Sequence, residues 1–147
     1  MKNTSYFSIF RGSALASRLN RWRHPYSGKI MVTLNDHELK IYFTRRAERA
    51  LSLLPQAINV ELQLYFSCMV KKRVLFHQQT VPFKTDPVTP LLNIAFRSVQ
   101  SDTCSPEEFA AHYPQKMALD NPALRKMYPR ELYIDYIDNH WSGDYII

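Results

Sequence analysis

The residues best suited to bind an anion lie together near the N-terminus. Arginines and aromatic residues are interleaved there within nine positions: Arg18, Arg21, Trp22, Arg23, His24 and Tyr26. Guanidinium groups neutralise phosphates, and aromatic rings offer surfaces on which bases stack. The same mixture suits an anionic membrane surface or an acidic protein. No RNP motif, zinc finger or helix-turn-helix pattern accompanies it, so the pattern indicates a polyanion-binding segment and leaves the polyanion open.

Residue types that perform catalysis or hold metals are scattered along the chain. The histidines are His24, His37, His77, His112 and His140, and no two have the spacing of a ligand pair. Cys68 and Cys104 form no CxxC pair, and opposite strand parity separates Cys68 from His77. The sequence contains neither G-x-S-x-G nor a glycine-rich phosphate loop. The acids of the last hairpin, Glu131, Asp135, Asp138 and Asp144, suit a solvated strand face. We therefore predict no catalytic residue, metal or cofactor.

The charge of the chain changes sign along its length. The net charge is +6 over 147 residues, yet the first acid is Asp36 and residues 98–147 hold eight acids against four bases. We divide the chain into a basic N-terminal arm, residues 1–28, and a single domain, residues 29–147. Besides a binding segment, two interpretations of the arm are open: a poorly ordered extension, with the domain starting near Met31, or, by its Arg-rich and acid-free composition, an organellar transit peptide.

The longest alternating segment, residues 59–78, is the one around which we expect the domain to form. Apolar residues occupy every second position from Val60 to Val70, which is the pattern of a half-buried strand. A basic cluster interrupts it: Lys71, Lys72 and Arg73. Either a three-residue loop or a bulge at Lys72 preserves the parity, and we favour the loop, which pairs Val70 with Val74. Its cations would then extend the basic surface of the arm.

Two further hairpins have two-residue turns that tolerate positive φ. Asn35-Asp36 pairs Val32 with Leu39, and Asp138-Asn139 pairs Tyr136 with Trp141. The other expected elements are helices starting at Thr44, Ser105 and Asn121, an irregular loop from Val81 to Pro90, and a strand from Leu92 to Val99. Together they predict an α+β domain with a mostly antiparallel sheet of about six or seven strands and short helices covering part of one face.

The function predicted from these features is binding without catalysis. We expect a cytoplasmic module that acts through protein contacts, with Tyr65 and Met69 on an exposed strand face and the basic arm as its contact surfaces. Nucleic acid or another polyanion, bound by the arm and residues 71–73, is the alternative ligand, and an enzyme of unrecognised type is a further alternative. No segment is long and apolar enough to span a membrane. Edge pairing of the last strand leaves a homo-oligomer open.

Overall fold

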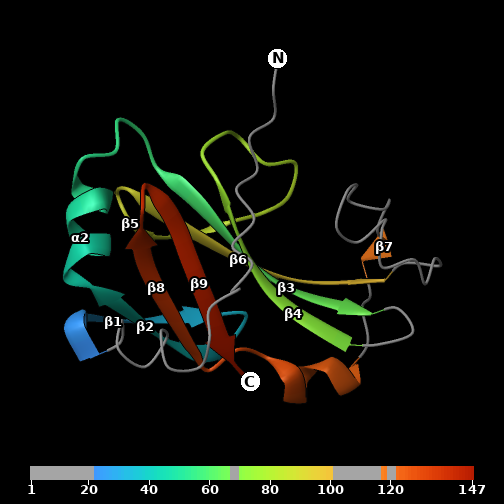
Figure 1. Cartoon of the computed structure of the whole chain (residues 1–147). Coiled ribbons are helices and arrows are strands. Elements are labelled where there is room, and N and C mark those ends of the chain that lie inside the picture. The colour runs from blue at the N-terminus through green and yellow to red at the C-terminus, as the bar shows by residue number, and fades with distance from the viewer. Residues whose placement is uncertain (1–21, 67–69, 101–116, 119–121) are drawn as a thin grey trace.

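The computed structural model describes residues 22–66, 70–100, 117–118 and 122–147. Their strands form two mixed sheets that pack face to face (Figure 1). Sheet A has the order β4-β3-β6-β5, with β7 also pairing with β6, and sheet B has the order β1-β2-β8-β9. The strands of sheet A are β3 (Ile58–Phe66), β4 (Val70–His77), β5 (Asp86–Thr89), β6 (Leu92–Gln100) and β7 (Met117–Ala118). Those of sheet B are β1 (Tyr26–Leu34), β2 (His37–Thr44), β8 (Glu131–Ile137) and β9 (His140–Ile146).

The structure confirms a strand-rich fold with short helices, in which antiparallel pairings outnumber parallel ones, but the strands form two mixed sheets and not the single sheet predicted. Each sheet joins two antiparallel pairs through a central parallel pair, β3 with β6 in sheet A and β2 with β8 in sheet B. Alternation along one strand reports which side chains face inward and does not identify the neighbouring strand. The two central pairings join strands that are distant in sequence, which is why they were missed.

Both two-residue hairpins have the predicted register. Val32 lies opposite Leu39, and Tyr136 lies opposite Trp141. The four turn residues all have positive φ, between 48° and 63°, as type I′ turns require: Asn35, Asp36, Asp138 and Asn139. Turn chemistry and apolar parity agree in both places, which explains the success of these two predictions.

The hairpin predicted at residues 71–73 is wrong in its position. These residues belong to β4, and the register pairs Phe66 with Val70, so the connection falls at residues 67–69, which lie outside the described residues. Val74 and Phe76 face the core as predicted because moving the turn by four residues preserves parity. Val70, expected on the apolar face, is 52% exposed.

Helix α2 (Arg45–Ser52) starts where the sequence predicts, because the Thr44 side chain accepts a hydrogen bond from the Ala47 N–H at 3.2 Å. A 3-10 helix, η1 (Pro122–Met127), forms where the short helix after Asn121 was expected. The helix predicted at Ser105 lies outside the described residues. The prediction that the loop from Val81 to Pro90 is irregular is wrong in part, because β5 pairs with β6 at the sheet edge, where a proline is tolerated.

The core lies between the two sheets and is apolar. Its fully buried members include Leu39 and Ile41 of β2, Leu62 of β3 and Ile94 of β6. The sheets approach closely at Gly143, where an added Cβ would lie 2.9 Å from Val74 Cγ1. Strand β1 begins at Tyr26 and therefore includes the last three residues of the predicted arm, residues 1–28. The division into arm and domain stays a prediction.

Candidate functional site

The outer face of sheet A carries a buried polar cluster around Glu61. This carboxylate is 3% exposed at the side chain and lies 2.9 Å from His77 Nε2 and 3.0 Å from Arg97 Nη1. Gln63 donates to Glu61 Oε1 at 2.9 Å, and Arg73 donates to Gln63. The Arg97 guanidinium also lies 4.4 Å from the centre of the Phe83 ring. Polar side chains on this face therefore bond mainly to one another.

Burial acts to raise the pKa of Glu61, but the hydrogen bond from His77 and the charge of Arg97 outweigh it. The pKa of Glu61 consequently lies below its ordinary value, and the carboxylate is charged at neutral pH. The strand register places His77 opposite Asn59 and beside Glu61.

The residues predicted as contact surfaces have different surroundings. Tyr65 is 2% exposed, so its placement on an exposed face is wrong, and Met69 lies outside the described residues. Lys72 Nζ donates to the Tyr145 carbonyl at 2.7 Å, and the Arg73 guanidinium lies 5.6 Å from the centre of the Tyr65 ring. The side chains of Lys72 and Arg73 thus make contacts within the protein, and Lys71 also has an interaction partner.

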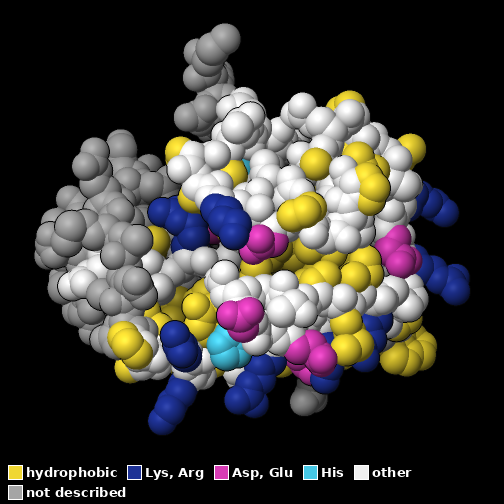
Figure 2. All heavy atoms as spheres, turned by 180° about the vertical axis from the view of Figure 1, so that it is seen from behind, with side chains coloured by type: hydrophobic (Ala, Val, Ile, Leu, Met, Phe, Trp, Pro, Cys, Tyr) yellow, Lys and Arg dark blue, Asp and Glu magenta, His cyan; other side chains and the backbone are white. Residues whose placement is uncertain are grey.

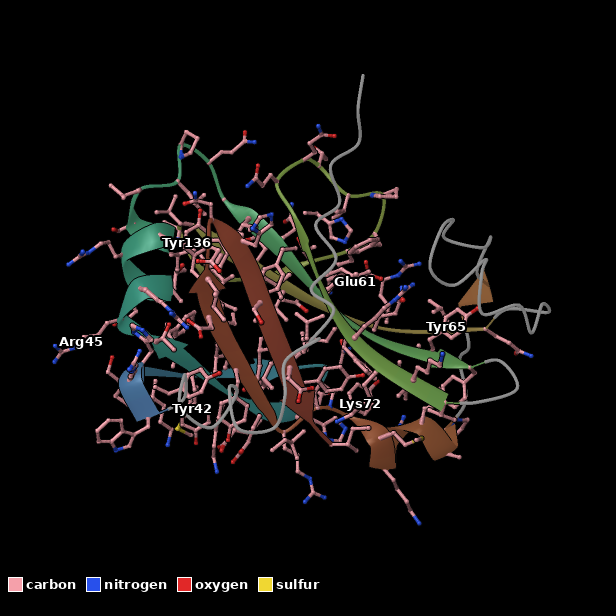
Figure 3. All side chains as sticks on the ribbon, viewed as in Figure 1. Tyr42, Arg45, Glu61, Tyr65, Lys72 and Tyr136 are labelled. Atoms are coloured by element: carbon pink, nitrogen blue, oxygen red, sulfur yellow. The ribbon has the colours of Figure 1, made fainter. Side chains whose placement is uncertain are left out.

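Of the residues predicted to form one basic surface, the structure describes Trp22, Arg23 and residues 71–73. Arg18 and Arg21 lie outside the described residues, while Trp22 is 82% exposed and Arg23 is exposed. Residues 22–23 lie beside α2 and β1, whereas Lys72 lies on the sheet-A side of the molecule (Figures 1 and 3). Residues 22–23 therefore lie away from Lys72, and a shared surface with Arg18 and Arg21 stays a prediction.

A row of three tyrosines lies on the outer face of sheet B. Tyr42 stacks on Tyr133 at 5.0 Å between ring centres with an interplanar angle of 12°. Tyr26 meets Tyr133 edge-on at 5.1 Å. We call these three residues the tyrosine row; each is partly exposed, and Lys29 Nζ lies 5.8 Å from the Tyr42 ring centre. The row offers aromatic surface on an open sheet face, on the same side of the view as Arg45 and Tyr136 (Figure 3).

Glu131 fixes one end of the tyrosine row. Tyr133 donates from its hydroxyl to Glu131 Oε2 at 2.5 Å. This hydrogen bond, together with partial burial, raises the pKa of Tyr133 to about 12. The ring plane is thereby held in place from its hydroxyl end as well as by its stacking on Tyr42.

A basic hollow of about 650 Å³ lies beside that end of the row, between β2, η1 and the start of β8. Four cationic side chains line it against two carboxylates: Lys40, Arg125, Lys126 and Arg130 against Glu38 and Glu131. His37 and Tyr128, also in the lining, stack at 4.4 Å. We call this site the η1 hollow. Figure 2 shows Lys and Arg side chains along the lower edge of the molecule, where η1 lies.

A second hollow, of about 360 Å³, lies beside α2 at the opposite end of the row. His24 and three arginines, Arg45, Arg46 and Arg49, surround an apolar floor of Ala50, Leu53 and Tyr136. We call it the α2 hollow. Both hollows adjoin sheet B, since β2 runs from Lys40 at the η1 hollow through Tyr42 to Thr44 at the start of α2.

Asp135 holds Arg46 in the α2 hollow. Arg46 donates from Nε to Asp135 Oδ1 and from Nη2 to Oδ2, both at 2.7 Å, and Thr44 donates to Oδ1 at 2.6 Å. Burial acts to raise the pKa of Asp135, but these hydrogen bonds outweigh it and lower the pKa. The Thr44 hydroxyl therefore has two roles: it caps α2 and it donates to Asp135. This joins the helix to β8.

Within the described residues, no group of three or more His, Cys, Asp or Glu side chains is placed to hold a metal ion. No helix in the described ranges is long and apolar enough to cross a membrane. Comparison with family models, curated proteins and solved structures found no match.

Sequence reasoning missed the tyrosine row although a signal was present. The predicted hairpin registers put Ile41 and Leu132 on the core face, and therefore Tyr42 and Tyr133 on the outer face. Aromatic residues on an outer face are a reason to suspect binding. What remained hidden was the parallel pairing of β2 with β8, which brings Tyr42 and Tyr133 together.

Proposed function

We propose that the protein is a non-catalytic binding module for single-stranded nucleic acid, which lies across the outer face of sheet B. The observation that carries the proposal is the tyrosine row, with Lys29 beside it and the η1 hollow, which includes Lys40, at one end. Bases stack on partly exposed rings whatever their sequence, and cations beside those rings neutralise the backbone phosphates. Protein contact remains the alternative class of ligand from the sequence, but the buried Tyr65 no longer supports it.

Charge and spacing favour a strand over a compact anion. Lys29 and Lys40 lie on the same outer face as the row, at positions in register with Tyr42 and Glu131. From Lys40 to Thr44 strand β2 advances four residues, or roughly 13 Å at the strand rise of about 3.3 Å. A path of this length with cations beside the rings accommodates a short run of nucleotides.

The test is fluorescence anisotropy with labelled 12-nucleotide RNA and DNA strands of mixed sequence over a salt series. The expected result is salt-sensitive binding that falls by about 5- to 150-fold in Tyr42→Leu, since stacking contributes about 1–3 kcal/mol per base. Lys40→Gln should reduce the slope of log K against log salt by about 0.7, the value for one phosphate of a single strand.

Two control variants remove similar groups away from the proposed surface. Lys84→Gln removes a cation whose side chain is 87% exposed in the loop before β5, and Phe83→Leu removes the ring that packs on Arg97. Neither should change the affinity by more than about two-fold. Equal losses in the controls, or binding to vesicles of anionic lipid in preference to oligonucleotides, would contradict the proposal.

A further inference from the structure

Among the described residues, the lining of the α2 hollow holds arginines and no acid. Asp135 pairs with Arg46, on which Asp138 also acts electrostatically, while among the described residues neither Arg45 nor Arg49 has an ion pair. Arg45 and Arg49 are four positions apart, so they lie on one face of the helix, where like charges repel. Arg45 also occupies the first helical position, where the helix dipole disfavours a cation. This arrangement is stabilised if an anion binds between the two guanidinium groups.

The apolar floor of the hollow indicates which kind of chemical group would accompany the anion. Ala50, Leu53 and Tyr136 form an apolar surface beneath the arginines. Tyr136 has the strand parity of the core-facing Leu132 and Ile134, so its ring lies on the core side of β8, edge-on against Trp141 with 4.8 Å between ring centres, and its partly exposed edge reaches the hollow. An anion with a flat, apolar group attached fits this combination, because the guanidinium groups bind the charge and the fixed ring accepts the flat group. A nucleotide has both parts.

The hollow adjoins the tyrosine row at the end of β8, although its floor residue Tyr136 lies on the other face of that strand. His24 lines it and stands two residues before Tyr26, and Arg46 in its wall binds Asp135, which shares the outer face of β8 with Tyr133. A strand lying on the row would therefore reach the hollow, and Tyr136 within it, by bending around the end of β8. A terminal phosphate monoester carries about −1.5 to −2 charges near neutral pH, against −1 for each internal diester. That charge matches the two guanidinium groups of Arg45 and Arg49.

From this match we propose that the α2 hollow binds the terminal phosphate monoester of the strand, with the terminal base on Tyr136. The proposal rests on the proposed function, because it concerns the end of the same bound strand. Arg45 and Arg49 hold the phosphate, and Arg46 supports the site from its fixed position on Asp135. The protein would thereby distinguish phosphorylated ends from hydroxyl ends.

The experiment compares three 12-nucleotide strands of one sequence, labelled internally, which carry a 5′-phosphate, a 3′-phosphate or hydroxyls at both ends. The full chain should bind one of the two phosphorylated strands about ten-fold more tightly than the hydroxyl strand, as two charge-assisted hydrogen bonds allow. In the double variant Arg45→Gln/Arg49→Gln this ratio should fall to about one. The matched control Arg130→Gln, in the η1 hollow, should weaken all three strands and preserve the ratio.

The outcomes separate this proposal from the proposed function. Binding of all three strands with equal affinity would overturn the terminal-phosphate site while leaving single-strand binding intact. Binding of none would overturn both. A preference that survives in the Arg45→Gln/Arg49→Gln variant would place the end of the strand elsewhere and would also overturn this proposal. Circular dichroism of each variant confirms that the fold is retained.

Discussion

The outer faces of the two sheets both carry polar side chains at alternate strand positions, yet their charges have different partners. On sheet A, Glu61 is bonded to His77, Arg97 and Gln63. At the edges of sheet B, the arginines of α2 and the cations of the η1 hollow outnumber the acids beside them. The polar groups of the first face bond to one another, whereas among the described residues beside the second the cations outnumber the acids, which is the basis of the proposed function.

The comparison teaches that alternation alone does not distinguish these two uses. Glu61 and Gln63 lie at positions that the sequence marks as solvent-facing, but they are 2% and 1% exposed. A buried carboxylate is tolerated only where charged and hydrogen-bonding partners replace water. The partners come from β4 and β6, and neither pairing register was predicted.

Removing the Glu61 carboxylate should cause the largest loss of unfolding free energy among the variants considered. Glu61→Ala leaves His77 and Arg97 without their common carboxylate in a buried site, which typically costs about 3–5 kcal/mol of unfolding free energy. Urea unfolding followed by circular dichroism measures the change. Oligonucleotide binding by the remaining folded protein should persist, because the cluster lies on the other sheet.

The control for this prediction is an exposed ion pair. Lys84 Nζ lies 3.9 Å from Asp86 Oδ1, with 87% of the lysine side chain exposed. Lys84→Ala should therefore cost less than about 1 kcal/mol. A similar cost for Glu61→Ala and Lys84→Ala would mean that the sheet-A cluster does not stabilise the fold.

Acidification should lower the unfolding free energy, because it protonates one carboxylate on each sheet, Glu61 and Asp135. The pKa values of Glu61 and Asp135 are lowered in the folded protein from ordinary values of 4.5 and 3.8. The unfolded chain consequently takes up protons first, and the stability present above about pH 4.5 is lost as the pH falls through the folded values. Each group contributes a slope of at most about 1.4 kcal/mol per pH unit.

Isosteric amides sharpen this prediction. We expect the unfolding free energy, measured from pH 7 to pH 3, to depend less on pH in Glu61→Gln than in the unmodified protein. The same is expected for Asp135→Asn. The two losses should add, because the groups lie on different sheets and share no bonded partner. A pH dependence unchanged in both variants would refute the assignment to these two carboxylates.

Local chemistry explains how far the sequence predicts the structure. Thr44 and the turn residues Asn35 and Asp36 specify their own conformations through neighbouring backbone groups, so α2 and the first hairpin were predicted correctly. The turn after Phe66 lacks such a signal, and the basic residues 71–73 were mistaken for it. The candidate site depends on β2 pairing with β8 across about ninety residues, a contact that no local pattern encodes.

The smallest expected effect concerns the hydroxyl of Tyr133. Tyr133→Phe keeps the ring that stacks on Tyr42 and removes only the hydrogen bond to Glu131, which should cost about 0.5–1.5 kcal/mol and leave oligonucleotide affinity within about two-fold. Because the folded pKa of about 12 exceeds the ordinary 10.0, this stabilisation is complete below pH 10 and is lost as the pH rises through 12.

Absorbance at 295 nm during an alkaline titration follows this group directly. The step near pH 12 should disappear in Tyr133→Phe and move toward pH 10 in Glu131→Gln, since the carboxylate is the main cause of the raised pKa. A step near pH 12 that persists in both variants would belong to another tyrosine. A large loss of oligonucleotide affinity in Tyr133→Phe would mean that the hydroxyl itself contacts the ligand, so the outer face of sheet B would bind through hydrogen bonds as well as stacking.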